Sequence, residues 1–150
     1  MTRVDFYVLE DAGDAARERF ACRLVEKACR LKHKVFVHAG SEAAAHRLDA
    51  LLWTFRDASF VPHVIDAAGL DEALAAATPV RIGAGGEPGF EAEILVNLGD
   101  EVPLFFSRFE RVAEIVPGDP AARAASRERF RFYRDRGYTL TTHDIGARAS

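Results

Sequence analysis

The feature that most constrains the fold is the regular alternation of short β-rich runs with helical segments along the chain of 150 residues. Residues 3–9 alternate apolar and polar side chains as a strand does, and residues 15–31 then place Phe20, Leu24 and Ala28 on one helical face. Alternation of this kind is typical of an α/β domain with a mostly parallel sheet between two helical layers. We therefore predict one three-layer αβα domain, with a frayed tail from about residue 145.

The remaining elements follow from the same periodicities and from their end signals. The expected strands are 34–40, 63–66, 79–83, 93–99, 111–117 and 138–143, and the expected helices are 41–53, 71–77, 103–109 and 119–137. Ser41 and Asp119 stand where helix N-caps are expected, and Pro120 suits the first helical position. The glycine-rich segment 84–89 is expected to be a hairpin or a loop between two strands.

The composition is that of a soluble globular protein, with 49% hydrophobic and 29% charged residues and a net charge of −3. A net charge this small excludes strong attraction of the whole chain to nucleic acid, so any anion site must be a local patch. The N-terminus has no apolar run of signal-peptide length, and no 18-residue apolar stretch is present. We therefore expect a cytosolic protein without a membrane span.

The two cysteines are expected to remain reduced. Cys22 and Cys29 are seven residues apart in a predicted helix, which separates them by roughly 10 Å along its axis. That distance is too long for a disulfide bond.

Signatures of catalysis and of metal binding are missing from the sequence. The glycines of residues 81–89 are not followed by a helix or by Gly-Lys-Ser/Thr, as nucleotide-binding loops require. The five histidines form no His-x-x-x-His pair, the cysteines form no Cys-x-x-Cys pair, and no G-x-S-x-G elbow occurs. We therefore expect no catalytic residues, no metal and no cofactor.

Residues 123–136 form a strongly basic segment, with six arginines and two acidic residues in a chain that is net acidic. Helical spacing predicts a row of four arginines, Arg123, Arg127, Arg131 and Arg134. Because Phe130 lies beside this row, the segment suits a peptide that offers a carboxylate and an apolar side chain. The same row suits phosphates. Alternatively, it is a solvated helix face whose Phe130 or Tyr133 belongs to the core.

A second unusual stretch is LWTFRDASFVPH, residues 52–63, in which large aromatic residues flank a polar loop. Trp53 ends the apolar stripe of its predicted helix, and Phe60 follows the loop. The pattern is equally compatible with burial of these rings in the core and with an exposed patch that a protein partner covers.

Five fragments in this order resemble a known family. The fragments are FYVL, HRLDALLW, SFVPH, ILVNL and RERFRFYRDRGYTL. Together they are similar, over essentially the whole chain, to the chi subunit of bacterial DNA polymerase III, an accessory protein of the clamp-loader complex. The block RLD…LW…SFVPH, followed by the C-terminal RER…YR..G, is the specific part of this resemblance.

The resemblance implies a Rossmann-like fold without nucleotide chemistry and a role in DNA replication. It implies a heterodimer with the psi subunit, which joins chi to the clamp loader. It also implies binding to the acidic, Phe-terminated C-terminal tail of single-stranded DNA-binding protein (SSB). Contact with DNA is then indirect, and the protein is associated with the replisome in the cytoplasm.

The resemblance also assigns residues to these two surfaces. The positions that match the tail site are Arg123, Arg127, Phe130, Arg131 and Val116, with Arg127 as the partner of the terminal carboxylate. Phe130 stands where the family often has tyrosine, so a hydrogen bond from that hydroxyl is lost here. Trp53 and Phe60 match the surface that faces psi.

Two other hypotheses remain open at this point. One is direct binding of nucleic acid by the arginine-rich helix, which predicts a steep dependence of affinity on salt. The other is a small α/β enzyme whose site lies at the C-terminal edge of the sheet, near Gly40 or residues 83–86.

Overall fold

The computed structural model describes residues 2–56, 60–66, 70–89 and 91–146. Its strands are β1 (Arg3–Leu9), β2 (Val35–His38), β3 (His63–Ile65), β4 (Val80–Gly83), β5 (Ile94–Asn97), β6 (Arg111–Val116) and β7 (Thr139–Ile145). Its helices are α1 (Asp14–Arg30), α2 (Glu42–Thr54), α3 (Glu72–Ala76) and α4 (Pro120–Asp135), with a short 3₁₀ helix, η1 (Phe106–Arg108).

The strands form one seven-stranded sheet in the order β3-β4-β2-β5-β6-β1-β7. Every strand pairing in the described part of the chain is parallel. Parallel neighbours need a crossover connection, which the intervening segments supply. The predicted α/β class and the Rossmann-like arrangement are therefore confirmed.

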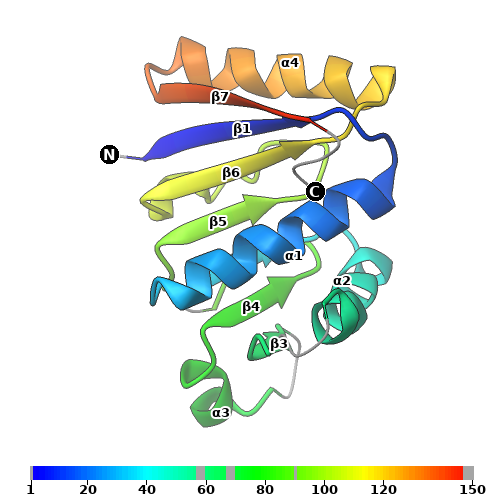
Figure 1. Cartoon of the computed structure of the whole chain (residues 1–150). Helices are drawn as coiled ribbons and strands as arrows, with labels where there is room; N and C mark the ends of the chain where they lie inside the picture. The colour runs from blue at the N-terminus through cyan, green and yellow to red at the C-terminus, as the bar shows by residue number, and fades with distance from the viewer. Residues whose placement is uncertain (1, 57–59, 67–69, 90, 147–150) are drawn as a thin grey trace.

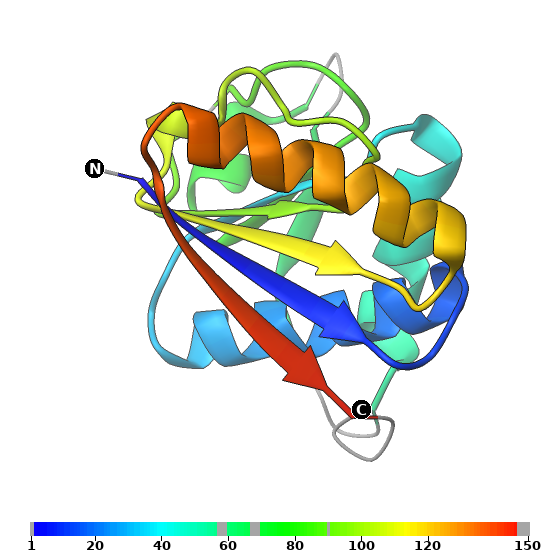
Figure 2. The same cartoon turned by 90° about the horizontal axis from the view of Figure 1, so that it is seen from above.

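Two hydrophobic clusters fill the spaces on the two faces of the sheet. One cluster joins α1 and α2 to the sheet and includes Val25, Leu48 and Val96. The other lies under α4 and η1 and includes Phe36 and Tyr133. Figure 2 shows α1 and α4 on opposite faces, which gives the predicted three layers. In the described part of the chain, no helix is both long and apolar enough to cross a bilayer.

The ends of the sheet differ in their surroundings (Figure 1). At one end, β3 is a three-residue edge strand near α2 and α3. At the other end, β7 is the edge strand, and α4 lies over β7, β1 and β6. These two ends carry the two surfaces that the sequence singled out.

Some local expectations were wrong. The expected helix 103–109 is only the 3₁₀ turn η1. Of the two structures expected for the glycine-rich segment, the loop is the one found, because β2 lies between β4 and β5 in the sheet. The last strand was expected to end at residue 143, whereas β7 continues to Ile145, which pairs with Leu9; residues 147–150 of the expected frayed tail lie outside the described part of the chain.

The two predicted N-caps also differ. Ser41 caps α2 as expected, since its Oγ accepts a hydrogen bond from the Ala44 amide at 3.1 Å. Asp119 occupies the N-cap position of α4 but makes no capping hydrogen bond. Its Oδ2 instead accepts from the Gly13 amide at 2.8 Å. The carboxylate thus ties the start of α4 to the loop between β1 and α1.

Candidate protein-binding surfaces

Helix α4 is fixed to the sheet by a buried polar network centred on Glu114 of β6. Oε1 of Glu114 accepts from Arg129 Nε at 2.9 Å, and Oε2 accepts from the Tyr133 hydroxyl at 2.8 Å. The Asn97 amide donates to both oxygens at 3.0 Å. Because a buried carboxylate is costly unless it is paired and hydrogen-bonded, this network favours the orientation of α4 in which Arg129 and Tyr133 face Glu114.

Two further interactions reinforce the network. Arg129 also donates to the Asp100 carbonyl at 3.0 Å, which ties the loop after β5 to the helix. Burial, followed by the adjacent Glu114 carboxylate, holds the pKa of Tyr133 far above its ordinary value. The Tyr133 hydroxyl therefore keeps its proton and acts as a donor.

The inward direction of Arg129 and Tyr133 leaves the predicted arginine row on the outer side of α4. All four of its side chains are exposed: Arg123, Arg127, Arg131 and Arg134. The row is therefore rigid at its backbone and open to solvent at its guanidinium groups. This arrangement suits a charged partner that approaches from outside.

The members of the row differ in their partners. Arg123 donates to the Leu9 carbonyl at 3.3 Å, so its guanidinium lies over the end of β1. Arg131 is paired with Glu128 at 2.9 Å and Arg134 with Asp135 at 3.2 Å, and all four of these side chains are exposed. Within the described residues, Arg127 has no carboxylate at ion-pair distance. Arg127 is thus the member of the row that is most available to an external carboxylate.

The apolar positions proposed beside the row are less exposed. Phe130 is half-buried, with its ring centroid 5.4 Å from that of Phe6. Val116 has only 1% of its surface exposed, because it belongs to the core under α4. Its side chain supports the surface from below and does not form a wall of it.

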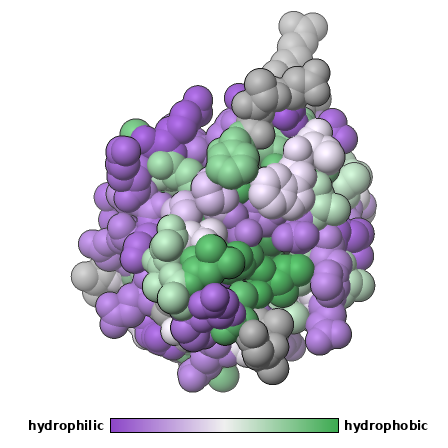
Figure 3. Space-filling model, turned by 90° about the horizontal axis from the view of Figure 1, so that it is seen from below, coloured by the Kyte–Doolittle hydropathy of each residue, from purple (hydrophilic) through white to green (hydrophobic). Residues whose placement is uncertain are grey.

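At the other end of the sheet, the two aromatic residues of the opening stretch lie on the surface. Trp53 is 50% exposed and Phe60 is 73% exposed. Their ring centroids are 5.9 Å apart. Figure 3 shows hydrophobic side chains gathered on this face of the molecule. Residues 57–59 of the intervening loop lie outside the described part.

His63 supports the Trp53 ring from beneath. The two ring centroids are 4.4 Å apart, and His63 itself is buried. Its Nδ1 lies 2.6 Å from the Val61 carbonyl, and its Nε2 lies 3.0 Å from the Asp49 carbonyl. The Trp53 ring therefore packs on an imidazole whose two nitrogens both contact backbone carbonyl groups. The other face of the Trp53 ring is open to solvent.

The C-terminal edge of the sheet, where an enzyme site was considered, holds a wide cavity of about 780 Å³ near Gly40 and Gly85. Its charges are mixed, and Arg17 and Arg47 are engaged by Asp14 and Glu18. His38 lines this cavity, and burial lowers its pKa. Among the described residues, no group of three or more His, Cys, Asp or Glu side chains is arranged to hold a metal.

A comparison with models of known protein families shows which family the chain belongs to. A family model described as "DNA polymerase III chi subunit, HolC" matches residues 1–141. The chain belongs to this chi subunit family. The resemblance inferred from the sequence fragments is therefore confirmed.

Curated members of the chi family match the chain over nearly its whole length. The DNA polymerase III subunit chi of Pseudomonas aeruginosa is 48% identical over 145 residues, which are 97% of this chain and 98% of that protein. The subunit from Haemophilus influenzae is 32% identical, covering 94% of this chain and 96% of that protein. The subunit from Escherichia coli is 30% identical, covering 95% and 97%.

Among solved structures, the chain is similar to one titled "The crystal structure of T4 UvsW". The TM-score is 0.69 with 9% sequence identity, over 97% of this chain and 42% of that one. At this identity the likeness concerns the fold alone. The two chains thus share a fold although only 9% of the aligned residues are identical.

The hydrogen-bond network around Glu114, which positions the arginine row on α4, was not predicted from the sequence. A signal was present, because Glu114 interrupts the apolar run of residues 111–117 and alternates with Val112 and Val116 on the same side of the strand. A charged residue at an inward strand position requires a buried partner. The basic helix next in sequence contains that partner, Arg129.

Proposed function

We propose that the chain is a non-catalytic accessory subunit of the DNA polymerase III holoenzyme. It joins the clamp loader, through the psi subunit, to the C-terminal tail of SSB, and it contacts DNA only indirectly. Its place of action is the replisome in the bacterial cytoplasm. Membership of the chi family supports this role at the level of DNA polymerase III, and two surface features support the finer assignment.

The observation that carries the proposal is the separation of two dissimilar surfaces on one rigid sheet. The exposed arginine row lies on α4, over the β6-β1-β7 end, and the Trp53–Phe60 pair lies near edge strand β3. A protein that bridges two partners needs two surfaces that do not compete for space. One surface is cationic and the other aromatic, so they select partners of different chemistry.

Three members of the arginine row, Arg123, Arg127 and Arg131, form the proposed site for the SSB tail. Arg127 receives the terminal carboxylate, because its guanidinium offers a bidentate fork and has no internal ion pair within the described residues. Arg123 attracts the acidic residues that precede the terminus, and Arg131, which Glu128 partly neutralises, adds a weaker attraction. Phe130 provides the apolar contact for the last side chain, and the buried Val116 lies in the core beneath.

The Trp53–Phe60 pair is the proposed site for psi. Large exposed aromatic rings are the favoured anchors of protein interfaces, because they bury much surface at a small cost in side-chain entropy. His63 and the end of α2 hold the tryptophan in place before binding.

A titration with a short acidic peptide that ends in Pro-Phe tests the tail site. The Arg127→Ala variant is expected to lose about 1.5–3 kcal/mol of binding free energy, the range for a hydrogen bond to a charged group. The matched control is Arg134→Ala, which removes an arginine from the same row that is already paired with Asp135. Equal affinity of the Arg127→Ala variant and the parent would disprove the carboxylate assignment.

Co-purification with psi tests the other surface. Trp53→Ala and Phe60→Ala are expected to lose psi and to retain the tail peptide, whereas Arg127→Ala is expected to do the reverse. A variant that loses both partners together would contradict two independent surfaces.

Direct binding of nucleic acid by α4 is disfavoured by the internal pairing of the row. Arg131 and Arg134 are partly neutralised by Glu128 and Asp135. The chain is expected to bind single-stranded DNA much more weakly than the peptide at physiological salt. Tight, strongly salt-dependent DNA binding that ignores a free carboxylate would favour this alternative.

A further inference from the structure

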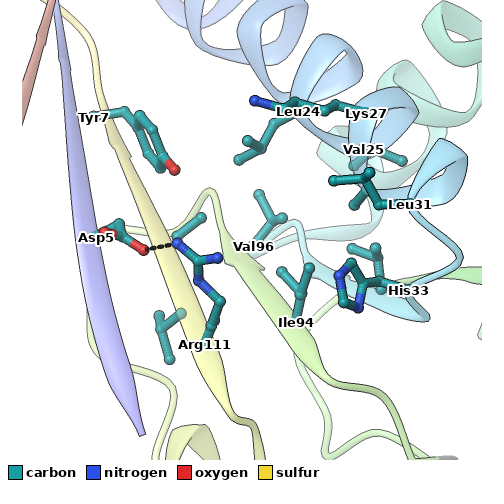
Figure 4. Close-up of a pocket in the computed structure, with 14 residues that line it drawn as sticks. Asp5, Tyr7, Leu24, Val25, Lys27, Leu31, His33, Ile94, Val96 and Arg111 are labelled. Atoms are coloured by element: carbon teal, nitrogen blue, oxygen red, sulfur yellow. Dashed lines mark hydrogen bonds and ion pairs between the residues drawn. The ribbon is translucent and has the colours of Figure 1, made fainter.

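A small cavity lies on the face of the sheet opposite α4. It lies between the C-terminal half of α1, the middle of β1 and the first residues of β5 and β6 (Figure 4), and its volume is about 140 Å³. The apolar part of its wall comes from Leu24, Val25, Ala28, Ile94, Val96 and Ala113. A benzene ring fits a cavity of about 150 Å³.

The size of the cavity limits what it can hold. Pockets for nucleotides and comparable cofactors measure roughly 300–1,000 Å³. The space here is sufficient for one ring or one branched alkyl group. Any ligand must therefore place a small apolar group inside and its remaining atoms at the mouth.

Polar side chains gather on one side of this space. Figure 4 shows Tyr7 and Arg111 pointing toward the opening between β1 and α1. Asp5 is also present, but its two oxygens are already engaged by Arg111 Nη2 at 3.0 Å and His143 Nε2 at 3.1 Å. Asp5 therefore orients Arg111 and leaves the other guanidinium N–H groups for a ligand. Lys27 adds a second positive charge at the rim.

Tyr7 supplies a further donor. Its ring is held between His143, at 4.8 Å between centroids, and Phe20, at 5.3 Å. Burial, and then the Asp5 carboxylate, raise the pKa of Tyr7, so the phenol stays protonated. Within the described residues its hydroxyl makes no hydrogen bond. A fixed O–H group without a partner thus stands next to a guanidinium that is only partly used.

We propose that this cavity binds a small carboxylic acid whose apolar part has the size of a benzene ring. The ring or branched chain fills the space between α1 and the sheet. The carboxylate lies at the mouth, where it accepts hydrogen bonds from Arg111 and Tyr7 and is attracted by Lys27. This site lies on the other side of the sheet from the arginine row and is independent of the proposed function.

Nuclear magnetic resonance titration of the full chain with phenylacetate tests the proposal. The amide signals of Tyr7, Leu24, Ala28 and Ala113 are expected to shift together. Phenylacetamide, which has the same shape without the charge, is expected to bind at least about tenfold more weakly, because charged acceptors form the stronger hydrogen bonds. Equal affinity for the two compounds, or shifts confined to other regions, would overturn the proposal.

Two variants separate the roles of the hydroxyl and of the cavity. Tyr7→Phe is expected to weaken phenylacetate binding about tenfold, while the control Tyr138→Phe on the opposite face leaves it unchanged. Ala28→Leu is expected to fill the cavity and abolish binding without loss of thermal stability, because substitutions that fill an existing cavity commonly stabilise a protein. Undiminished binding by Ala28→Leu would contradict the location.

The acidic peptide ending in Pro-Phe distinguishes a free acid from a peptide terminus. It is expected to shift signals of α4 and to leave those of the cavity in place. Shifts in the cavity and none on α4 would overturn both this proposal and the tail site, whereas a failure on α4 alone would leave the cavity result standing.

Discussion

Nε of Arg129 lies 2.9 Å from Oε1 of Glu114, and these two buried side chains join α4 to the centre of the sheet. The pair fixes which side of the helix faces inward. Arg127, two residues earlier in the same helix, is thereby directed outward and is exposed. The exposure of the outer arginines thus depends on a buried arginine of the same helix.

The first prediction concerns this buried pair. Arg129→Met keeps most of the side-chain volume but leaves the Glu114 carboxylate buried without its cation, so the free energy of unfolding is expected to fall by about 3–5 kcal/mol. Urea denaturation measures this change. The matched control, Arg127→Met, is expected to stay within about 0.5 kcal/mol of the parent. Similar effects of the two substitutions would contradict the inward role of Arg129.

The second prediction concerns the salt dependence of tail binding. Raising the ionic strength from about 0.1 M to about 1 M shortens the Debye length from roughly 10 Å to 3 Å. The affinity for the acidic peptide is therefore expected to fall with salt. Calorimetric titration at several salt concentrations checks this, and the slope should be shallower for Arg123→Gln than for the parent. An affinity that does not change with salt would exclude the arginine row as the site.

The third prediction separates surface from core among the aromatic residues. Phe60 is 73% exposed whereas Phe36 is 0% exposed. Phe36→Ala is expected to cost about 3–5 kcal/mol of folding free energy, while Phe60→Ala is expected to cost less than about 1 kcal/mol. Thermal and chemical denaturation provide the comparison. If Phe60→Ala were as damaging as Phe36→Ala, Phe60 would be a core residue rather than a partner contact.

The fourth prediction concerns His38. Burial lowers its pKa below the ordinary value of 6.5, and its Nδ1 is buried without a hydrogen-bond partner among the described residues. The unfolded state therefore takes up a proton before the folded state as the pH falls. The free energy of unfolding should decrease from about pH 7 downward until the folded-state pKa is reached.

The His38→Leu variant isolates this contribution, because the other histidines are common to both proteins. Denaturation at pH 7 and pH 5 should show a smaller loss of stability for the variant than for the parent. An equal loss of stability in the two proteins would mean that folding does not lower the pKa of His38.

The fifth prediction concerns the cysteines. Burial raises the pKa of Cys22 to about 12 and that of Cys29 to about 11, and both are free thiols. Because the thiolate is the reactive form, labelling by a thiol reagent near pH 8 should be slow in the folded protein and fast in urea. Rapid stoichiometric labelling of the native chain would contradict the burial of α1 against the sheet.

Much of the architecture was accessible from local sequence pattern. The period of the apolar residues predicted β1, α1, α2, β6 and α4 to within about two residues. The helix that carries Arg123 and Arg127 was predicted, and so was the exposure of their row. These features depend on residues within a few turns of one another, so the periodicity of the backbone is sufficient to reveal them.

Other features were decided only when distant segments came together. The Asp119 side chain does not cap α4, because its carboxylate accepts a hydrogen bond from the amide of Gly13, 106 residues away. Trp53 and Phe60 were equally compatible with core and surface, and the short edge strand β3 left them exposed. The pairing of Glu114 with Arg129 and the cavity beneath Tyr7 depend on which strands lie side by side. Strand order is a property of the whole chain, because it results from the joint burial of surfaces that are far apart in sequence, and no local pattern encodes it.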